Sequence, residues 1–403
     1  MAWRAMASWR TERRRGTPSA PPMPREGPAR LDRARAAMAR AGLDALLLLN
    51  STNLVYLSGY PAVERTLARP HYLVVPRRGR PAFLVHEGRA AEARKYGWID
   101  DVRTYHALSV APLAELSGLF ADLDLHAGRI GCELGFDQRI GIPFGEFERL
   151  RAELAPARFE DASAVLWPLR MIKSAADLAA LREACRITSD ALERTILAAR
   201  AGTTDRAAAI AVQGHMTGAG ARDPWVALAA GQGNYDLATG VGHGQVLEPG
   251  DMVWMDAGCT VEGFRSDFGR AGVIGGPSAE QQDAQRQIWE VTMEGVRMAR
   301  PGVPVRDIAA HVNLRVAALG LPLTSNVSGL AGRVGHGLGL DTTEPPHISE
   351  QDPTVLEAGM VITIEPGVAT QFGIFHVEQD VVVTPDGPEV ISRAPWPLRP
   401  IPA

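Results

Sequence analysis

One stretch near the middle of the chain constrains the fold most, because it places two aspartates in strand-forming sequence. Residues 252–270 read MVWMDAGCTVEGFRSDFGR, in which Asp256 ends an apolar run and Asp267 follows eleven positions later, beyond a glycine-containing reversal. A carboxylate inside such an apolar run has to be paired, hydrogen-bonded or metal-bound. The pattern therefore predicts two adjacent strands, the first ending at Asp256, that hold a cation between the two aspartates.

The length and composition indicate a two-domain globular protein. A chain of 403 residues, 46% hydrophobic and 22% charged, is too long for one ordinary core. Its net charge of −4 gives no basic surplus for a nucleic acid partner, and the apolar segment 45–50 is far shorter than the roughly 20 residues of a membrane span. Cys132, Cys185 and Cys259 lack metal-type spacing. We therefore expect free thiols and a cytoplasmic location without membrane contact.

The order of the predicted elements divides the chain into three parts. Residues 1–29 are Arg-rich and are expected to be a disordered basic tail, consistent with a targeting segment or with a start at Met23. Residues 30–165 alternate helix and strand, which predicts an α/β domain around a parallel or mixed sheet. Near the boundary, Ser174 is expected to cap a long helix with Asp177 three residues on. That helix opens a second domain over 172–395.

The second domain is expected to contain further helices and strands in a defined order, with no internal repeat. Residues 231–244 hold five glycines and are expected to form a loop. A single final strand is expected over 375–384, so that residues 376, 378 and 380 share one face. The Pro-rich end is expected to be an irregular tail. Further helices are expected over 204–216, 279–299 and 305–319, and a further strand over 360–364.

Three more residues have the character of metal ligands. Glu365 ends an apolar strand before Pro-Gly, Glu378 lies in the final strand, and His336 lies in a GHG loop whose glycines admit a ligand. Together with Asp256 and Asp267 they make four carboxylates and one imidazole, which one divalent ion would not balance. Two divalent ions roughly 3.5–4 Å apart would balance them and would share a hydroxide for attack on an acyl or amidine carbon.

This order of residues resembles the pita-bread family, which includes methionine aminopeptidases, aminopeptidase P, prolidase and creatinase. The shared pattern is Asp, a second Asp eleven residues on, His in a GHG loop, Glu before Pro-Gly and Glu in a closing strand. Residues 30–60 and 169–192 are similar to the two-domain prolidase and aminopeptidase P branch. The resemblance implies a creatinase/prolidase-type α/β N-terminal domain and an α+β pita-bread catalytic domain.

The resemblance also implies a role for each ligand. Asp256 would hold one ion, Asp267 and Glu378 would bridge both ions, and His336 with Glu365 would complete the other. Glu365 would also be the general base or acid that moves the proton between water and the leaving amine. The implied cofactors are two divalent ions, with manganese favoured over cobalt or zinc. A homodimer acting on short peptides or another small-molecule substrate is implied as well.

The chain departs from the family pattern around these ligands. A second His that normally follows the metal His by seven positions is Thr343 here, and His347 is a candidate to compensate for it. The usual substrate-loop position is Thr239, while the nearby His243 is a candidate for that catalytic role. An Arg common two residues before the last Glu is His376, expected beside the metal ligands. These changes bear on peptide specificity more than on metal binding.

Three functions follow from the pattern. The leading hypothesis is a dinuclear metal-dependent exopeptidase that hydrolyses Xaa-Pro peptide bonds, of the Xaa-Pro dipeptidase or aminopeptidase P type. The alternative is a non-peptidase of the same fold, a creatinase-like C–N hydrolase or a lyase on a small molecule. Thr343, Thr239 and His376 favour it, although creatinase-type members act without the metal pair. A metal-free binding module ranks last, because it predicts eroded ligands. Arg270, Asp380 and Trp254 are expected to be structural.

Overall fold

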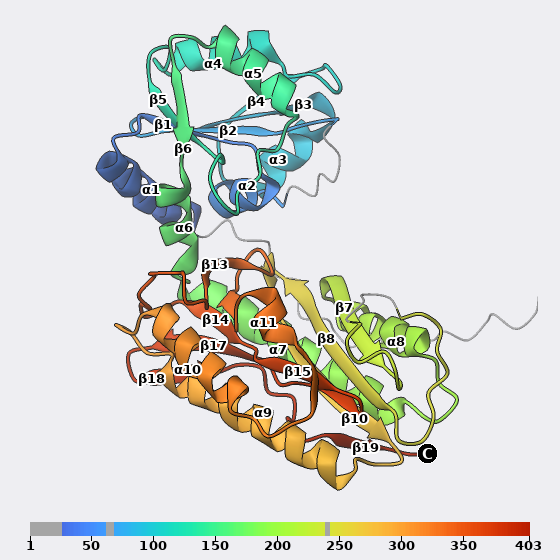
Figure 1. Ribbon diagram of the computed structural model, residues 1–403. Coiled ribbons are helices and arrows are strands. Elements are labelled where there is room, and N and C mark those ends of the chain that lie inside the picture. The colour runs from blue at the N-terminus through green and yellow to red at the C-terminus, as the bar shows by residue number, and fades with distance from the viewer. Residues whose placement is uncertain (1–25, 62–67, 238–241) are drawn as a thin grey trace, which may run out of the picture.

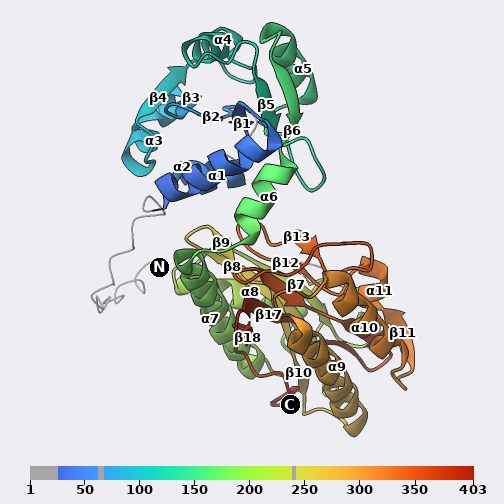
Figure 2. The same cartoon turned by 90° about the vertical axis from the view of Figure 1, so that its left-hand side faces the viewer.

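The computed structural model describes residues 26–61, 68–237 and 242–403, which form two domains joined by helix α6 (Ser163–Met171) (Figures 1 and 2). The smaller N-terminal domain is α/β and the larger C-terminal domain is α+β, as the sequence predicted. Of the expected tail, residues 1–25 lie outside the described residues. The end of the tail was predicted wrongly, because helix α1 (Gly27–Ala41) already includes residues 27–29. No helix among the described residues is long and apolar enough to cross a membrane.

The N-terminal domain is built on a six-stranded mixed sheet in the order β4-β3-β2-β1-β5-β6. Strand β1 pairs antiparallel with β2 and parallel with β5. Because side chains alternate along a strand, Leu46 and Leu48 of β1 pack toward α1 and α2, and Leu47 packs toward α4 and α5. The strands are β1 (Ala45–Leu48), β2 (Tyr72–Pro76), β3 (Ala82–His86), β4 (Asp101–Tyr105), β5 (Arg129–Cys132) and β6 (Arg158–Asp161). The helices are α2 (Ser51–Ser58), α3 (Ala90–Tyr96), α4 (Leu113–Asp122), α5 (Phe144–Glu153) and the short 3-10 helix η1 (Glu87–Arg89).

The predicted cap of the long helix that opens the C-terminal domain is present. Helix α7 (Ala175–Ala198) begins with a capping box, in which the Asp177 N–H donates to Ser174 Oγ and the Ser174 N–H donates to the Asp177 carboxylate. Asp177 also binds the buried guanidinium of Arg30 at 2.5 Å. Because Arg30 belongs to α1, the cap of α7 also ties the first helix of the N-terminal domain to the C-terminal domain.

The C-terminal domain combines three sheets with flanking helices. In the sheet that contains β14 and β17, the side chains of Val361 and Val382 pack toward α7. Their neighbours Ile362 and Val381 pack toward α9 and α10, so helices cover both faces of this sheet. The first sheet has the order β19-β10-β8-β7 with β9 on β8, and contains β7 (Arg222–Ala230), β8 (Met252–Val261), β9 (Phe264–Arg265), β10 (Phe268–Ile274) and β19 (Arg399–Ile401). The second has the order β13-β12-β14-β17-β18, and contains β12 (His336–Gly337), β13 (Glu344–His347), β14 (Val361–Ile364), β17 (Gln379–Thr384) and β18 (Gly387–Val390). The third is β11 (Leu323–Asn326), β15 (Gly367–Thr370) and β16 (Gly373–His376), and the helices are α8 (Asp205–Gly218), α9 (Ala279–Met298), α10 (Val305–Ala317) and α11 (Val327–Ala331).

Three predictions about strands were wrong. Strand β8 does not end at Asp256 but continues to Val261, because Ala257 pairs with β7 and β10 and the residues after it pair with β7 or β9. The final strand is broken at residues 377–378, since β16 pairs with β15 and β17 pairs with β14 in another sheet. The Pro-rich end is not irregular throughout, because β19 pairs in parallel with β10.

The C-terminal domain also contains an internal repeat that we did not predict. Residues 247–256 read LEPGDMVWMD and residues 356–365 read LEAGMVITIE. Gly250 and Gly359 occupy equivalent positions, and both have a positive φ, 93° and 92°, that favours glycine. Isolated bridges precede each segment, at Val246 and at Val355. In each half of the domain, a glycine turn thus leads into a strand, and Asp256 and Glu365 occupy equivalent positions after the turn.

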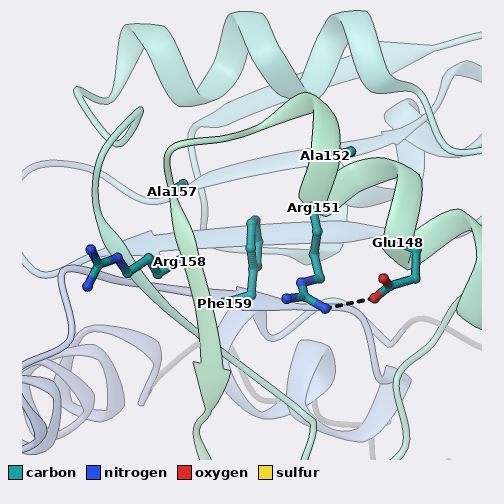
Figure 3. Close-up of a pocket in the computed structure, with 6 residues that line it drawn as sticks. All are labelled: Glu148, Arg151, Ala152, Ala157, Arg158 and Phe159. Atoms are coloured by element: carbon teal, nitrogen blue, oxygen red, sulfur yellow. Dashed lines mark hydrogen bonds and ion pairs between the residues drawn. The ribbon is translucent and has the colours of Figure 1, made fainter.

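A shallow hollow of about 390 Å³ lies on the N-terminal domain, between α5 and β6 (Figure 3). Its charged lining is partly self-paired, because Arg151 binds Glu148 at 2.8 Å. The residues that line it are Glu148, Arg151, Ala152, Ala157, Arg158 and Phe159. None of the five predicted metal ligands belongs to this domain, so the hollow is not the candidate site.

Candidate metal centre

Two adjacent antiparallel strands bring Asp256 and Asp267 to one place. Asp256 lies within β8, where its Cα partner in β10 is Gly269. Asp267 directly precedes β10, and the next residue, Phe268, is paired with Ala257. The predicted pair of neighbouring strands with two aspartates is therefore present, although Asp256 lies in the middle of β8 and Asp267 directly before β10.

The other three predicted ligands come from the second half of the domain. His336 begins β12, Glu365 directly follows β14, and Glu378 lies in the break between β16 and β17. The break turns the chain from one sheet into another, so Glu378 is free of the regular alternation that we expected to set its direction. His336 and Glu365 are adjacent because β12 pairs with β14.

These side chains form two overlapping groups that share Glu378. Ligand atoms of Asp267, His336 and Glu378 all lie within 4.8 Å of one another, as do those of Glu365, His376 and Glu378. His336 Nε2 is 3.3 Å from Asp267 Oδ2 and 3.2 Å from Glu365 Oε1. Asp256 belongs to neither group. The geometry offers two neighbouring positions for a cation, with one carboxylate common to both.

Burial makes this cluster unfavourable without a cation. Burial and the Asp267 charge raise the pKa of both Asp256 and Glu378 well above the ordinary value, and burial raises the pKa of Asp267 to about 6. Both carboxylate oxygens of Glu378 and Oδ1 of Asp256 have no hydrogen-bond donor among the described residues. Buried carboxylate oxygens without donors are the groups that a divalent ion satisfies. The donor set therefore fits metal ions.

His336 and Glu365 are held in defined orientations. His336 Nδ1 lies 3.0 Å from the Gly337 carbonyl, which directs Nε2 toward the carboxylates. Thr363 Oγ1 accepts from the His336 N–H at 3.0 Å and donates to Glu365 Oε1 at 3.1 Å. Burial lowers the pKa of His336, but the Glu365 and Asp267 carboxylates outweigh it and raise the pKa to about 9. Conversely, burial raises the pKa of Glu365, yet the charges of His336 and His376 bring it down to about 2.

His376 reaches the cluster itself. Its Nε2 is 3.6 Å from Glu365 Oε2, and its ring packs edge-on against Trp254, with 5.3 Å between ring centroids. The sequence placed His376 beside the ligands because of its spacing from Glu378. The contact with Trp254, expected to be only structural, shows that the β8 strand also helps to position this imidazole.

Two residues expected to be structural prove to support the ligands. Asp380 Oδ2 accepts the Asp267 N–H at 3.2 Å and the Cys185 thiol at 3.1 Å. Arg270 is buried and donates to the Glu378 carbonyl at 2.7 Å, and burial lowers its pKa to about 10. Neither role could be read from spacing, because both contacts join segments more than 100 residues apart.

Thr343 and His347 lie at the edge of the cluster, on a hairpin that faces the N-terminal domain. His347 is the Cα partner of His336. Arg333, which the sequence did not single out, lies 3.4 Å from Thr343 Oγ1 and 3.3 Å from His347 Nδ1. His347 Nε2 lies 2.6 Å from Asp137 Oδ2 of the N-terminal domain. His347 is thus an interdomain contact, and its compensating role stays a prediction.

The glycine-rich loop is described only in part. Thr239 lies outside the described residues. The His243 N–H donates to Asp205 Oδ2 at 2.7 Å, and the His243 side chain is exposed. Asp205 begins α8, so the backbone of this loop is fixed to the start of that helix. A catalytic role for His243 remains a prediction.

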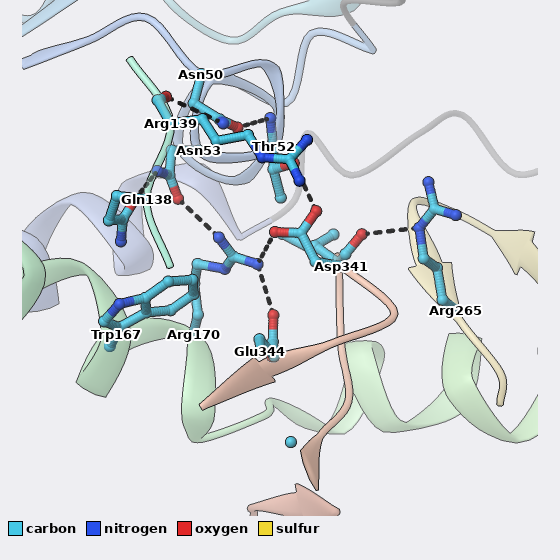
Figure 4. Close-up of polar contacts among 12 residues, drawn as sticks. Asn50, Thr52, Asn53, Gln138, Arg139, Trp167, Arg170, Arg265, Asp341 and Glu344 are labelled. Atoms are coloured by element: carbon cyan, nitrogen blue, oxygen red, sulfur yellow. Dashed lines mark hydrogen bonds and ion pairs between the residues drawn. The ribbon is translucent and has the colours of Figure 1, made fainter. Parts of the chain in front are cut away.

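A buried ionic network supports the hairpin that carries Thr343 (Figure 4). The fully buried Glu344 binds Arg170 at 2.5 Å and Lys173 at 2.7 Å. Arg170 also binds Asp341 at 2.7 Å and donates to Asn53 of the N-terminal domain at 3.2 Å. Burial raises the pKa of Glu344, but the two cations outweigh it and hold the pKa below its ordinary value. The network joins the N-terminal domain, α6 and the site hairpin.

Comparison with known proteins finds relatives of both domains. Residues 179–385 match the model of metallopeptidase family M24, and residues 30–172 match the creatinase/prolidase N-terminal domain. An Xaa-Pro dipeptidase of Pyrococcus horikoshii is 29% identical over 254 residues, covering 62% of this chain and 71% of the relative. An uncharacterized peptidase, YqhT of Bacillus subtilis, is 25% identical over 92% of this chain and 99% of its own. The crystal structure of dipeptidase PepE from Mycobacterium ulcerans superposes with a TM-score of 0.81 at 25% identity, covering 94% of this chain and 99% of that chain.

Proposed function

The chain belongs to metallopeptidase family M24, and from this premise we propose that it is a dinuclear metal-dependent exopeptidase that hydrolyses Xaa-Pro peptide bonds. Membership supports a hydrolase that acts as a peptidase. The observation that carries the finer proposal is the pair of ligand groups that share Glu378, because it offers two cation positions side by side. The Xaa-Pro dipeptidase of Pyrococcus horikoshii supports the choice of bond.

The five predicted ligands divide between the two positions in this proposal. Asp256 would hold one ion, Asp267 and Glu378 would serve both ions, and His336 and Glu365 would hold the other. This division differs from the two groups in the structure, where His336 and Glu365 belong to different groups and Asp256 to neither. Divalent ions bound there would activate water for attack on the scissile carbonyl. Manganese is the proposed ion, with cobalt or zinc as alternatives, because hard oxygen ligands outnumber nitrogen.

Glu365 is the proposed general base and acid. Its carboxylate lies between the His336 and His376 imidazoles, 3.2 and 3.6 Å away, and accepts from Thr363. These partners fix its position and keep it ionised, as a general base must be before it takes a proton from water and passes it to the leaving amine. His376 then acts on the reaction through Glu365.

Several further assignments belong to the same proposal. The domains extend over 30–165 and 172–395, the active form is a homodimer, and short peptides are the substrates. We also propose a cytoplasmic location. It is supported by Cys132, Cys185 and Cys259, which are buried free thiols.

A second candidate is a non-peptidase that acts on a small molecule. Thr343 supports it, because a hydroxyl replaces the imidazole expected next to a peptide substrate. The retention of all five ligands weighs against a creatinase-like reaction without metals.

A dipeptide panel tests the two candidates. Metal-stripped protein is assayed on Xaa-Pro and Xaa-Ala dipeptides with and without added manganese, and the assay is repeated with Glu365→Ala. Manganese-dependent cleavage confined to Xaa-Pro and lost in the variant supports the peptidase. Binding of two ions per chain without cleavage of any dipeptide supports the small-molecule enzyme instead.

A further inference from the structure

His376 lies at a cation position that the five predicted ligands leave incomplete. Ligand atoms of Glu365, His376 and Glu378 lie within 4.8 Å of one another. His336 and Asp267 belong to the other group, which shares Glu378. Within the part of the chain that the structure describes, Glu365 and Glu378 are therefore the two predicted ligands of this position. A catalytic zinc ion, for comparison, is typically held by three protein ligands. His376 is the third donor that the position requires.

The separation of His376 from Glu365 fits two ligands of one ion better than a hydrogen bond. His376 Nε2 and Glu365 Oε2 are 3.6 Å apart. An N–H···O hydrogen bond is shorter, about 2.7–3.2 Å between the heavy atoms. Two ligand atoms that each lie about 2.0–2.2 Å from one ion are roughly 3–4 Å apart, depending on the angle between them. The two atoms therefore have the separation expected when both face the same cation.

The direction of the His376 ring is fixed by two glycines and an indole. A Cβ at Gly269 would lie 2.8 Å from His376 Nδ1, and a Cβ at Gly367 would lie 2.8 Å from His376 Cδ2. Real Cβ atoms do not approach other atoms so closely, so a larger residue at either glycine would displace the imidazole. Trp254 packs edge-on against the ring, with 5.3 Å between ring centroids. The imidazole is thus held with Nε2 toward the carboxylates.

The buried groups at this position are suited to a cation. His376 is 6% exposed and Glu378 is fully buried. Both carboxylate oxygens of Glu378 and the Nδ1 atom of His376 have no hydrogen-bond partner among the described residues. A neutral imidazole that carries its proton on Nδ1 has a lone pair on Nε2. That lone pair faces carboxylate oxygens, which is favourable only when a cation lies between them.

We propose, resting on the dinuclear function proposed above, that His376 is itself a ligand, through Nε2, of the cation that Glu365 and Glu378 hold. Each of the two ions then binds one imidazole, His336 at one position and His376 at the other, with Glu378 common to both. This gives His376 a direct contact with the ion in place of an action through Glu365 alone. The centre has six protein ligands in this arrangement, one more than the sequence predicts.

Cobalt-substituted protein tests this assignment without any substrate. Cobalt(II) strongly shifts the proton NMR signals of its ligands, so each bound imidazole gives one shifted signal, from its ring N–H, that exchanges with water. The protein with two cobalt ions per chain is expected to show two such signals, and His376→Gln to show one. Chelator competition should show that one ion binds at least about 100-fold more weakly in His376→Gln, beyond the loss of about 10- to 100-fold for a residue that only orients a ligand.

His311→Gln is the matched control. The His311 imidazole binds Glu294 at 2.8 Å, between α10 and α9, and belongs to neither group of ligands. This variant should keep both shifted signals and both cobalt affinities. Circular dichroism shows whether His376→Gln is folded; if it is not, the number of signals in the unaltered protein decides the assignment alone.

Two results would overturn the assignment: a single shifted, exchangeable signal in the unaltered protein with two ions bound, or two signals that persist in His376→Gln. Peptide cleavage separates this failure from failure of the proposed function. Two signals without cleavage of any dipeptide support the ligand and reject the reaction. Manganese-dependent cleavage of Xaa-Pro dipeptides by a protein that shows a single signal supports the reaction and rejects the ligand.

Discussion

Removal of the Arg170 guanidinium should destabilise the protein strongly, because it leaves a buried charge under-compensated. Glu344 is fully buried, and the Arg170 and Lys173 side chains that bind it are 3% and 1% exposed. Breaking a buried ion pair from one side costs about 3–5 kcal/mol. Lys173 remains in Arg170→Met, so we expect a loss at the lower end, about 3 kcal/mol of the free energy of unfolding.

Urea unfolding followed by circular dichroism measures this loss, and Arg182→Met is its control. Arg182 also binds a glutamate, Glu389, through two hydrogen bonds of 2.9 and 2.6 Å, but the two side chains are 40% and 36% exposed. An exposed pair contributes about 0–1 kcal/mol. A loss in Arg170→Met no larger than that in Arg182→Met would refute the reasoning.

A triple variant separates buried charge from lost packing. Arg170→Met, Lys173→Met and Glu344→Leu together remove the buried charges while keeping apolar volume. Replacement of a whole buried ionic cluster is often neutral or stabilising. The triple variant should therefore be more stable than Arg170→Met alone. If it is less stable, shape rather than charge is the main contribution of these side chains.

Three further predictions concern buried charges. Burial raises the pKa of Glu133 from 4.5 to about 7. The stabilisation of the fold by the protonated Glu133 is therefore complete below pH 4.5 and is lost as pH rises through 7. Glu133→Gln should remove about 3 kcal/mol of the pH dependence of the free energy of unfolding, measured by urea titrations at pH 5 and 8. Because protons compete for Asp256, Asp267 and Glu378, metal affinity should fall from pH 8 to pH 5, with proton release detected by calorimetry in two buffers. Arg270→Met should lower the free energy of unfolding by about 3 kcal/mol or more and weaken metal binding, because the Glu378 carbonyl loses its donor. A urea titration and a metal titration measure the two effects. An unchanged metal affinity would contradict the support of Glu378 by Arg270.

The sequence by itself determined the features that depend on neighbouring residues. The capping box at Ser174 is local, since its donor and acceptor lie three residues apart. The order of the acidic residues and His336 is likewise readable, because an acid at the end of an apolar strand, or a histidine between glycines, violates the usual composition of a core. These signals were sufficient for the family and the two-domain fold. They also named four of the side chains that form the two groups around Glu378, whereas Asp256 belongs to neither group.

Only the tertiary structure decided the features that depend on pairing between distant segments. The break at residues 377–378 follows from two sheets competing for one apolar run, and periodicity alone cannot show which sheet each half joins. The pairing of β19 with β10 and the support of Asp267 by Asp380 likewise join segments more than 100 residues apart. Arg333 has an ordinary sequence context, and its position between Thr343 and His347 arises only when β12 pairs with β13 and the N-terminal domain supplies Asp137. Local propensity fixes which residues are unusual, whereas long-range packing fixes which of them meet.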